Sequence, residues 1–283
     1  MAKYEYTKEE KHGIPVGVKL TDMMRQYIDA KFRHPEALLF FRMGDFYEMF
    51  FQDAELGGQY LGLTVTSRNK DSAVSEPMSG FPHHQLNTYL NRALNAGFKV
   101  SICEQLSDPK ESKGIVKRGI TQVVTPGVIL EGDTLQERSN HFLVSVYPQN
   151  LSVSEIKTLE GAELYGIAAI DVSSGMFQTT EVMGLGALRC ELGRLDPREI
   201  LLPEEADALA AIIAKRFSHL TISRCPLFAY DERQAERLIQ RLVTDEGIPA
   251  LESVREFGFG VSALPLKASG AAVAYVLETQ RAF

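Results

Sequence analysis

Long apolar segments and cysteines are both scarce in this sequence. No run of about 18 apolar residues occurs, which argues against a membrane-spanning helix. Residues 1–19 are polar and charged, so we expect no secretory signal peptide. The cysteines, Cys103, Cys190 and Cys225, lie far apart without Cys-x-x-Cys spacing, which argues against a disulfide framework or a zinc site. These absences predict a protein of the reducing cytoplasm with no membrane partner.

Nucleotide-binding loops are also missing. The chain contains no Gly-x-x-x-x-Gly-Lys-[Ser/Thr] motif, and Gly184-Leu185-Gly186 is not followed by the third glycine of a dinucleotide-binding loop. We therefore expect this chain to have no ATPase activity and to hold no cofactor or metal of its own.

An overall excess of positive charge is lacking, since the net charge is -7. The total hides an asymmetry: residues 1–127 contain 16 Lys and Arg against 15 Asp and Glu, whereas residues 128–283 contain 14 against 22. Any surface that meets phosphates should therefore belong to the first half, and its mixed charge predicts weak non-specific binding.

What the sequence does contain is an unusual stretch over residues 40–50, where an apolar run is broken by Gly44-Asp45 and resumes with a carboxylate among aromatics. Gly and Asp favour a turn. If the chain stays extended beyond it, the period of two places Phe46 and Glu48 on one face. Two readings stay open: an exposed aromatic and carboxylate pair, or a core Phe46 with Glu48 in the first turn of a helix over residues 52–62.

This stretch, Arg42-Met43-Gly44-Asp45-Phe46-Tyr47-Glu48-Met49-Phe50, resembles the N-terminal part of the bacterial MutS family of mismatch-recognition proteins. Further segments carry the same resemblance, from Thr21-Asp22-Met23-Met24 through Cys103-Glu104-Gln105 and Val124-Thr125-Pro126-Gly127 to Glu278-Thr279-Gln280-Arg281. The resemblance implies that Phe46 wedges beside a mispaired base and that Glu48 hydrogen-bonds that base. It therefore implies mismatched duplex DNA as the partner.

The physics of a wedge supports this expectation. Inserting an aromatic ring between base steps costs a few kcal/mol of unstacking, and base-aromatic stacking returns about 1–3 kcal/mol. A mispaired base is already poorly held, so the balance favours insertion at mismatches. A carboxylate is repelled by phosphates, so Glu48 suits a base contact, either as an acceptor for a base N–H or as a protonated donor.

Other candidate DNA contacts lie in two polar segments. The resemblance places the region of Arg68, Met78, Ser79 and His83 near the mismatch, with Arg68 at a phosphate and Met78 as an apolar neighbour of the wedge. The segment 107–118 is rich in lysine and arginine, so it is either a backbone-contacting stretch or a solvated loop. Its candidates are Lys110, Lys113, Lys117 and Arg118.

The chain length predicts two domains, its 45% hydrophobic content is that of a globular protein, and the alternation of helices and strands predicts an α/β fold. In the first, Thr21 or Asp22 caps a helix with a core stripe of Met24, Tyr27, Ile28 and Phe32. In the second, a hairpin precedes alternating helices and strands, which predicts a mixed sheet. This second pattern resembles the RNase H-like connector domain of the MutS family.

A second function is open in this domain. Asp171 ends a predicted strand and precedes Ser173-Ser174-Gly175, as the first metal-binding carboxylate does in RNase H-type nucleases. Such enzymes need several carboxylates around two divalent ions. Glu204, Glu205 and Asp231 are available, but their spacing does not show that they converge on Asp171, and an Asp beside this turn is also ordinary hairpin chemistry.

The resemblance completes the expected organisation. We expect a mobile arm (1–19), a mismatch-recognition domain (20–127), a connector domain (128–257) and a truncated start of a core helical domain (258–283), whose helix lacks its packing partner. It also implies that the ATPase, with ATP and Mg²⁺, and most homodimer contacts belong to later domains, and that a downstream mismatch-repair protein binds the connector.

Overall fold

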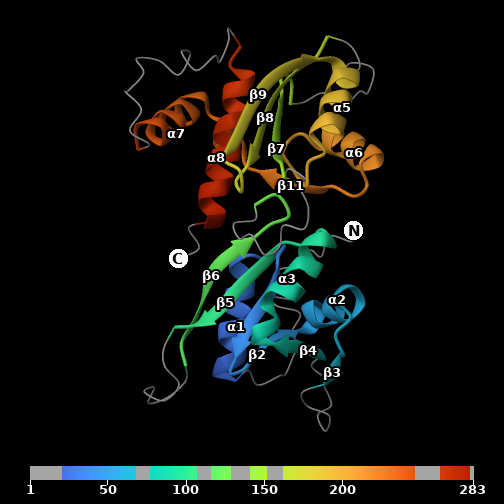
Figure 1. Ribbon diagram of the computed structural model, residues 1–283, viewed down its shortest axis with the longest axis vertical. Helices are drawn as coiled ribbons and strands as arrows, with labels where there is room; N and C mark the ends of the chain where they lie inside the picture. Colours follow the sequence, from blue (N-terminus) through green and yellow to red (C-terminus); the bar gives the residue numbers. More distant parts are fainter. Residues whose placement is uncertain are drawn as a thin grey trace. The chain divides into compact units, whose positions relative to one another are not determined.

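The structure, a computed structural model, describes residues 21–67, 77–106, 116–128, 141–151, 162–245 and 262–280. The chain divides between Thr125 and Pro126 into two compact units, each with its own mixed sheet (Figure 1). The predicted two-domain α/β fold is thus confirmed, whereas the finer limits of the arm and domains stay predictions. No helix in the described ranges has the length and apolar character needed to cross a membrane.

The first unit has a six-stranded sheet in the order β3-β4-β2-β1-β5-β6, in which only β1 and β5 pair in parallel. The strands are β1 (Leu38–Met43), β2 (Phe46–Phe50), β3 (Thr66–Ser67), β4 (Pro77–Pro82), β5 (Val100–Gln105) and β6 (Arg118–Val124). The helices are α1 (Asp22–Arg33), α2 (Phe51–Leu61) and α3 (Leu86–Asn95), with a short 3₁₀ helix η1 (His83–Gln85) after β4.

The neighbouring residues Phe40 and Phe41 of β1 lie on opposite faces of this sheet. Phe41 packs with Tyr27 of α1, their ring centroids 5.4 Å apart, whereas Phe40 lies 4.9 Å from Phe81, which stacks on Tyr89 of α3. The alternation follows from the period of two in a strand. The sheet is therefore covered by helices on both faces, and β1 is buried between them.

Helix α1 begins where the sequence predicts. The Thr21 hydroxyl accepts a hydrogen bond from the Met24 amide at 3.3 Å, as an N-cap does. Met24, Tyr27 and Ile28 are buried as expected. The prediction that Phe32 belongs to this core is wrong, because its side chain is 43% exposed on the last turn.

The second unit has a five-stranded sheet in the order β11-β10-β7-β8-β9, with β7, β10 and β11 parallel and β8 and β9 antiparallel to their neighbours. The strands are β7 (Leu143–Pro148), β8 (Leu164–Asp171), β9 (Met176–Met183), β10 (Glu199–Pro203) and β11 (Thr221–Cys225). The helices are α5 (Gly184–Leu195), α6 (Asp207–Arg216), α7 (Glu232–Asp245) and α8 (Leu264–Gln280), with a 3₁₀ helix η3 (Leu227–Tyr230).

Helices cover both faces of this sheet as well (Figure 1). Leu185, Leu188 and Leu192 of α5 pack with Leu209 and Ile213 of α6 in one core cluster. On the opposite face, α8 packs on the sheet with its alanines, and α7 packs against α8. A hairpin followed by alternating helix and strand therefore gives the mixed sheet that the sequence predicts.

The expectation that the helix after residue 258 lacks a packing partner is wrong. Ala268, Ala271 and Ala272 of α8 are fully buried within the second unit. A Cβ added at Gly270 would lie 2.4 Å from the Cβ of Ala235 in α7, so the missing side chain lets the two helices approach closely. Helix α8 is therefore an integral part of this unit.

Candidate nucleic-acid interface

The residues Gly44 and Asp45 form a two-residue hairpin loop between β1 and β2. Met43 and Phe46 face each other as the last strand pair before the loop. Gly44 has φ +58°, the value required at the first central position of a type II′ turn, where glycine is favoured. The turn delivers Phe46 to the end of the sheet with its side chain 46% exposed.

Beyond the turn the chain stays extended, which confirms the condition for Phe46 and Glu48 to share a face of β2. Tyr47, on the other face, is buried and donates its hydroxyl hydrogen bond to Glu104. Burial and this bond raise the pKa of the Tyr47 phenol. Tyr47 therefore anchors the strand from within, while Phe46 on the opposite face remains open to a ligand.

The strand β4 supplies the direct neighbours of both residues. Pro82 pairs with Phe46, and Gly80 pairs with Glu48. A Cβ at Gly80 would lie 3.4 Å from Cγ of Glu48 and 2.7 Å from the Tyr47 carbonyl oxygen. The missing side chain at Gly80 thus makes room for Glu48. Neither neighbour is predictable from the local sequence, because the pairing register of two strands depends on contacts between distant segments.

Two side chains bind the carbonyl groups of the turn itself. The Arg42 Nε donates to the Gly44 carbonyl at 2.5 Å. The His83 backbone N–H donates to the Asp45 carbonyl at 2.8 Å, and its Nδ1 lies 3.1 Å from the same oxygen. The predicted DNA-contact candidate His83 therefore lies beside the hairpin and holds its turn.

The candidate Arg118 begins β6, and its side chain is bound within the first unit. Its Nε donates to the Arg42 carbonyl at 2.7 Å, and its guanidinium carbon lies 5.3 Å from the centroid of the Phe41 ring. Burial lowers the pKa of Arg118, whereas the nearby Glu48 carboxylate acts to raise it. Arg118 thus supplies positive charge close to Glu48.

The remaining basic candidates are only partly described. Lys117 is exposed, and its carbonyl accepts from the Leu106 amide at 2.8 Å. The hydrogen bond between Leu106 and Lys117 lies next to Gln105 and Arg118, the last residue pair of β5 and β6. Arg68, Lys110 and Lys113 lie outside the described residues.

Two further candidates, Met78 and Ser79, lie on β4. Met78 pairs with Phe50 and packs against the core cluster of α1, while Pro82 is the residue of β4 that pairs with Phe46. A role of Met78 beside the wedge stays a prediction. Ser79 is 2% exposed, and its hydroxyl lies 2.9 Å from the position that a Cβ at Gly57 of α2 would take. In this structure the Ser79 side chain is therefore buried, and its role as a DNA contact stays a prediction.

The carboxylates of the nuclease alternative do not converge. Asp171 ends β8, which runs antiparallel to β7, whereas Glu204 and Glu205 follow β10, which runs parallel to β7. Asp231 follows β11, which is parallel to β10. Asp171 thus lies at the opposite end of the sheet from the other three. Among the described residues no group of three or more His, Cys, Asp or Glu is placed to hold a metal ion.

Asp171 instead organises the β8–β9 hairpin. Its Oδ1 accepts from the Ser173 amide at 3.0 Å and from the Ser173 hydroxyl at 2.6 Å, while Oδ2 accepts from the His141 amide at 3.4 Å. Burial raises the pKa of Asp171, but hydrogen bonds from Ser173, Ser174 and His141 outweigh it and lower the pKa overall. This is the hairpin chemistry that the sequence left open.

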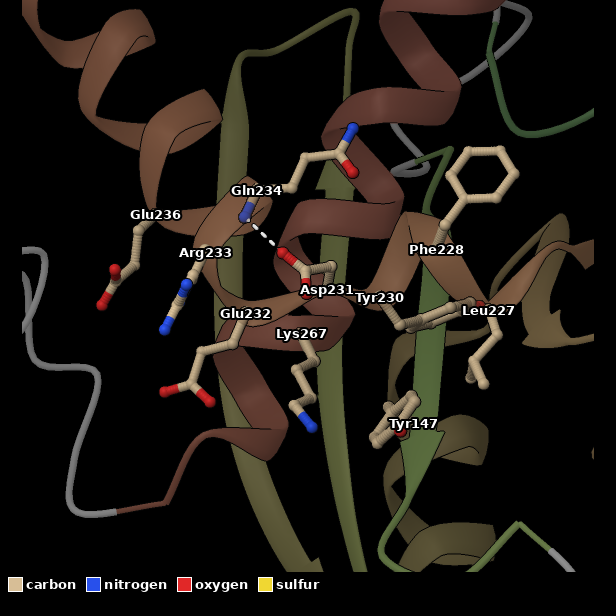
Figure 2. Close-up of a pocket in the computed structure, with 10 residues that line it drawn as sticks. All are labelled: Tyr147, Leu227, Phe228, Tyr230, Asp231, Glu232, Arg233, Gln234, Glu236 and Lys267. Atoms are coloured by element: carbon tan, nitrogen blue, oxygen red, sulfur yellow. Dashed lines mark hydrogen bonds between the residues drawn. The ribbon is translucent and has the colours of Figure 1, made fainter.

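The second unit carries a separate pocket of about 890 Å³ (Figure 2). Leu227 and Phe228 of η3 line it together with Tyr147 of β7, and Phe228 is 69% exposed. Lys267 of α8 lies over the Tyr147 ring, with Nζ 5.1 Å from the centroid. The pocket thus joins exposed apolar side chains to charged ones from α7 and α8.

Fold and site together define a protein with two α/β units, the first of which presents an exposed aromatic and a carboxylate on a braced hairpin. Two family models match the chain: MutS domain I over residues 21–133 and MutS domain II over residues 142–283. The second match extends through helix α8. The chain belongs to the MutS family.

Curated relatives agree with this assignment. The DNA mismatch repair protein MutS of Desulfatibacillum aliphaticivorans is 40% identical over 268 residues, which cover 93% of this chain and 28% of the relative. The MutS of Anaeromyxobacter dehalogenans is 42% identical over 93% of this chain and 27% of the relative. The MutS of Sorangium cellulosum is 45% identical over 196 residues, which cover 69% of this chain and 21% of the relative. This chain therefore spans about a quarter of the length of the relatives it matches.

Proposed function

We propose that this chain binds mismatched duplex DNA in DNA mismatch repair, with Phe46 as a wedge beside the mispaired base and Glu48 in contact with that base. One observation carries the proposal: a Phe that is 46% exposed shares a strand face with Glu48 immediately after a tight turn, in a chain of the MutS family. A buried Phe46 would have favoured the core alternative.

The energetics favour mismatches over normal pairs. Unstacking a base step costs a few kcal/mol, which stacking on an aromatic ring repays only in part. A poorly stacked mispair lowers the cost and leaves the gain unchanged. Glu48 adds selectivity, because a carboxylate among phosphates is favourable only when it meets a base donor or carries a proton.

Binding by this chain alone should be weak. Residues 1–127 carry nearly equal numbers of basic and acidic residues, and residues 128–283 carry an excess of acidic residues. Bending DNA by 40 to 90° costs on the order of 1–6 kcal/mol. We expect a Kd in the micromolar range of non-specific contacts. Fluorescence anisotropy with a G·T duplex at about 0.15 M salt measures it, and nanomolar affinity would reveal a larger interface.

The wedge is tested by competition between mismatched and matched duplexes. Phe46→Ala should bring the ratio of the two affinities close to one. Phe32→Ala is the matched control, because Phe32 is similarly exposed, at 43%, but lies on the last turn of α1. An unchanged ratio in Phe46→Ala, with the ratio of the control also unchanged, would contradict the proposal. Glu48→Gln should alter the ratio as well.

The same proposal assigns a partner surface to the second unit. A downstream mismatch-repair protein would insert apolar side chains beside Leu227 and Phe228 in the pocket of Figure 2, which Asp231 and Lys267 also line. Phe228→Ala should weaken binding of such a purified protein, whereas Phe177→Ala, at a 40% exposed Phe on β9, should not. Homodimer contacts, ATP and Mg²⁺ are proposed for parts of the longer relatives that this chain does not cover.

A further inference from the structure

The turn that carries Phe46 is held from both sides. Its first carbonyl, that of Gly44, accepts from Arg42 Nε on β1. Its second, that of Asp45, accepts from the backbone N–H of His83 at 2.8 Å and lies 3.1 Å from His83 Nδ1. These contacts come from Arg42 on β1 and from His83, the first residue of η1 directly after β4. Movement of the turn away from either residue would break a hydrogen bond.

These hydrogen bonds do little for the stability of the fold. Gly44 and Asp45 are exposed, and exposed carbonyl groups can bond to water instead, so the net gain from each protein hydrogen bond is small. A pair of bonds to one exposed turn does, however, restrict its motion. Their main effect is therefore on the position of the residue that follows the turn.

Arg42 is itself fixed. Its carbonyl accepts from Arg118 Nε at 2.7 Å, and its guanidinium carbon lies 5.5 Å from the centroid of the buried Tyr47 ring. We call Arg42 and His83, which bind the two carbonyl groups of the turn, the brace. Arg42 connects the brace to the interior of the unit through Tyr47 and to β6 through Arg118. Strain applied at Phe46 would be transmitted to the sheet and would not be lost in a flexible loop.

We infer that His83 is a positioning residue for the wedge, with Arg42 as the second arm of the brace. This inference rests on the proposed function. A wedge discriminates by pushing against the base stack, because the push succeeds only where the stack is deformable. A loose hairpin would withdraw from matched and mismatched sites alike. The brace therefore sets discrimination, and it leaves the affinity for matched duplex nearly unchanged.

The chemistry of the imidazole defines the conservative variant. Nδ1 donates to the Asp45 carbonyl only when that nitrogen carries a proton. Asn at position 83 has an amide donor at a similar distance from the backbone, so His83→Asn should keep the bond and His83→Ala should remove it. The neighbouring His84 is exposed, and its ring centroid lies 5.9 Å from that of His83, so His84→Ala is the matched control. Arg42 is less suitable, because its loss also removes a positive charge.

The experiment measures two quantities on the full 283-residue chain. Competition binding gives the ratio of mismatched to matched affinity together with the matched affinity itself. Amide hydrogen exchange in the free protein reports the mobility of Phe46 and Tyr47. We expect His83→Ala to lower the ratio about fivefold, which corresponds to about 1 kcal/mol, with faster exchange and matched affinity within twofold. His83→Asn should restore both readouts, and His84→Ala should resemble the unmodified chain.

Three outcomes would overturn the inference. An unchanged ratio in His83→Ala would show that the brace does not set discrimination. Equal losses for matched and mismatched duplex would make His83 a direct DNA contact. Unchanged exchange at Phe46 and Tyr47 would show that the brace does not restrain the hairpin. If Phe46→Ala also leaves the ratio unchanged, the proposed function itself has failed, and the exchange data still show whether the brace exists.

Discussion

Lys31 and Asp53 form an ion pair inside the first unit, with Nζ of the lysine 2.8 Å from Oδ1 of the aspartate. The aspartate is only 3% exposed. Its Oδ2 also accepts from the Leu39 amide at 2.9 Å and from the Tyr27 hydroxyl at 3.4 Å. One carboxylate thus connects α1, α2 and β1, the strand that leads into the Phe46 hairpin.

Removing that carboxylate should strongly destabilise the first unit. Asp53→Ala leaves the Lys31 charge and the Leu39 amide buried without their partner, so we expect a loss of about 3–5 kcal/mol in the free energy of unfolding. Urea titration measures this loss, with amide hydrogen exchange in β1 as the readout. A readout within the first unit is needed because the two units need not unfold together. Glu55→Ala, exposed on the same helix, is the control. A loss below about 1 kcal/mol would contradict this account.

A side chain at position 80 should disturb the strand that carries Phe46 and Glu48. In Gly80→Ala the new Cβ would lie 2.7 Å from the Tyr47 carbonyl oxygen, which is backbone and cannot move aside cheaply, so we expect a cost of about 1–3 kcal/mol. Gly193→Ala in α5 is the contrasting variant, because nothing lies within 4 Å of its added Cβ.

Since Gly193 lies inside a helix, the alanine there should stabilise the second unit by about 0.5–1 kcal/mol. Thermal unfolding of both glycine variants, followed by circular dichroism, compares the two. Equal shifts in melting temperature in the same direction would show that crowding at Gly80 is not the determining factor.

Alkaline pH should weaken the first unit through Cys103. Burial raises the pKa of its thiol from an ordinary value of 9.0 to about 12. Between these values the folded chain holds a proton that the unfolded chain has lost, so stability is full below about pH 9 and falls as pH rises, by about 1.4 kcal/mol per unit for this one group. Denaturant titrations from pH 8 to 11 should show a shallower decline in Cys103→Ala.

The same burial protects the thiol. At pH 8 the exposed Cys190 should react with iodoacetamide, while Cys103 and Cys225, both buried, should react only after unfolding. Rapid labelling of Cys103 in the folded chain, detected by peptide mass spectrometry, would contradict the assigned burial.

Glu199 and Tyr275 should be energetically coupled in the second unit. The Tyr275 hydroxyl donates to Glu199 Oε1 at 2.6 Å, Ser223 Oγ donates to the same oxygen at 2.5 Å, and Oε2 accepts from the Gly127 amide at 3.1 Å. Glu199→Gln and Tyr275→Phe should each cost about 1–3 kcal/mol.

A double-mutant cycle should give a coupling energy of about 0.5–3 kcal/mol. Tyr60→Phe, at a 46% exposed tyrosine in the first unit, is the control and should be additive with Glu199→Gln. Additivity of Glu199→Gln and Tyr275→Phe would show that the carboxylate does not hold α8 through this bond.

Local physics in the sequence determined much of the first unit. The hydroxyl of Thr21 and the spacing of Met24, Tyr27 and Ile28 define α1, since capping and helical period act over a few residues. The turn at Gly44 and the extended backbone through Phe46 and Glu48 likewise follow from turn chemistry and a period of two. That pattern also placed Phe46 and Glu48 on one face.

Only the tertiary structure decided what surrounds these residues. Strand order and register depend on contacts between distant segments. The local pattern therefore could not predict that Pro82 lies beside Phe46, that Gly80 lies beside Glu48, or that His83 contacts the Asp45 carbonyl. For the same reason the sequence did not reveal that Ser79 points inward. Helix α8 is rich in small apolar residues around its whole circumference, so its sequence shows no preferred face. Its position between the sheet and α7 was set by the close approach that Gly270 and Ala235 allow.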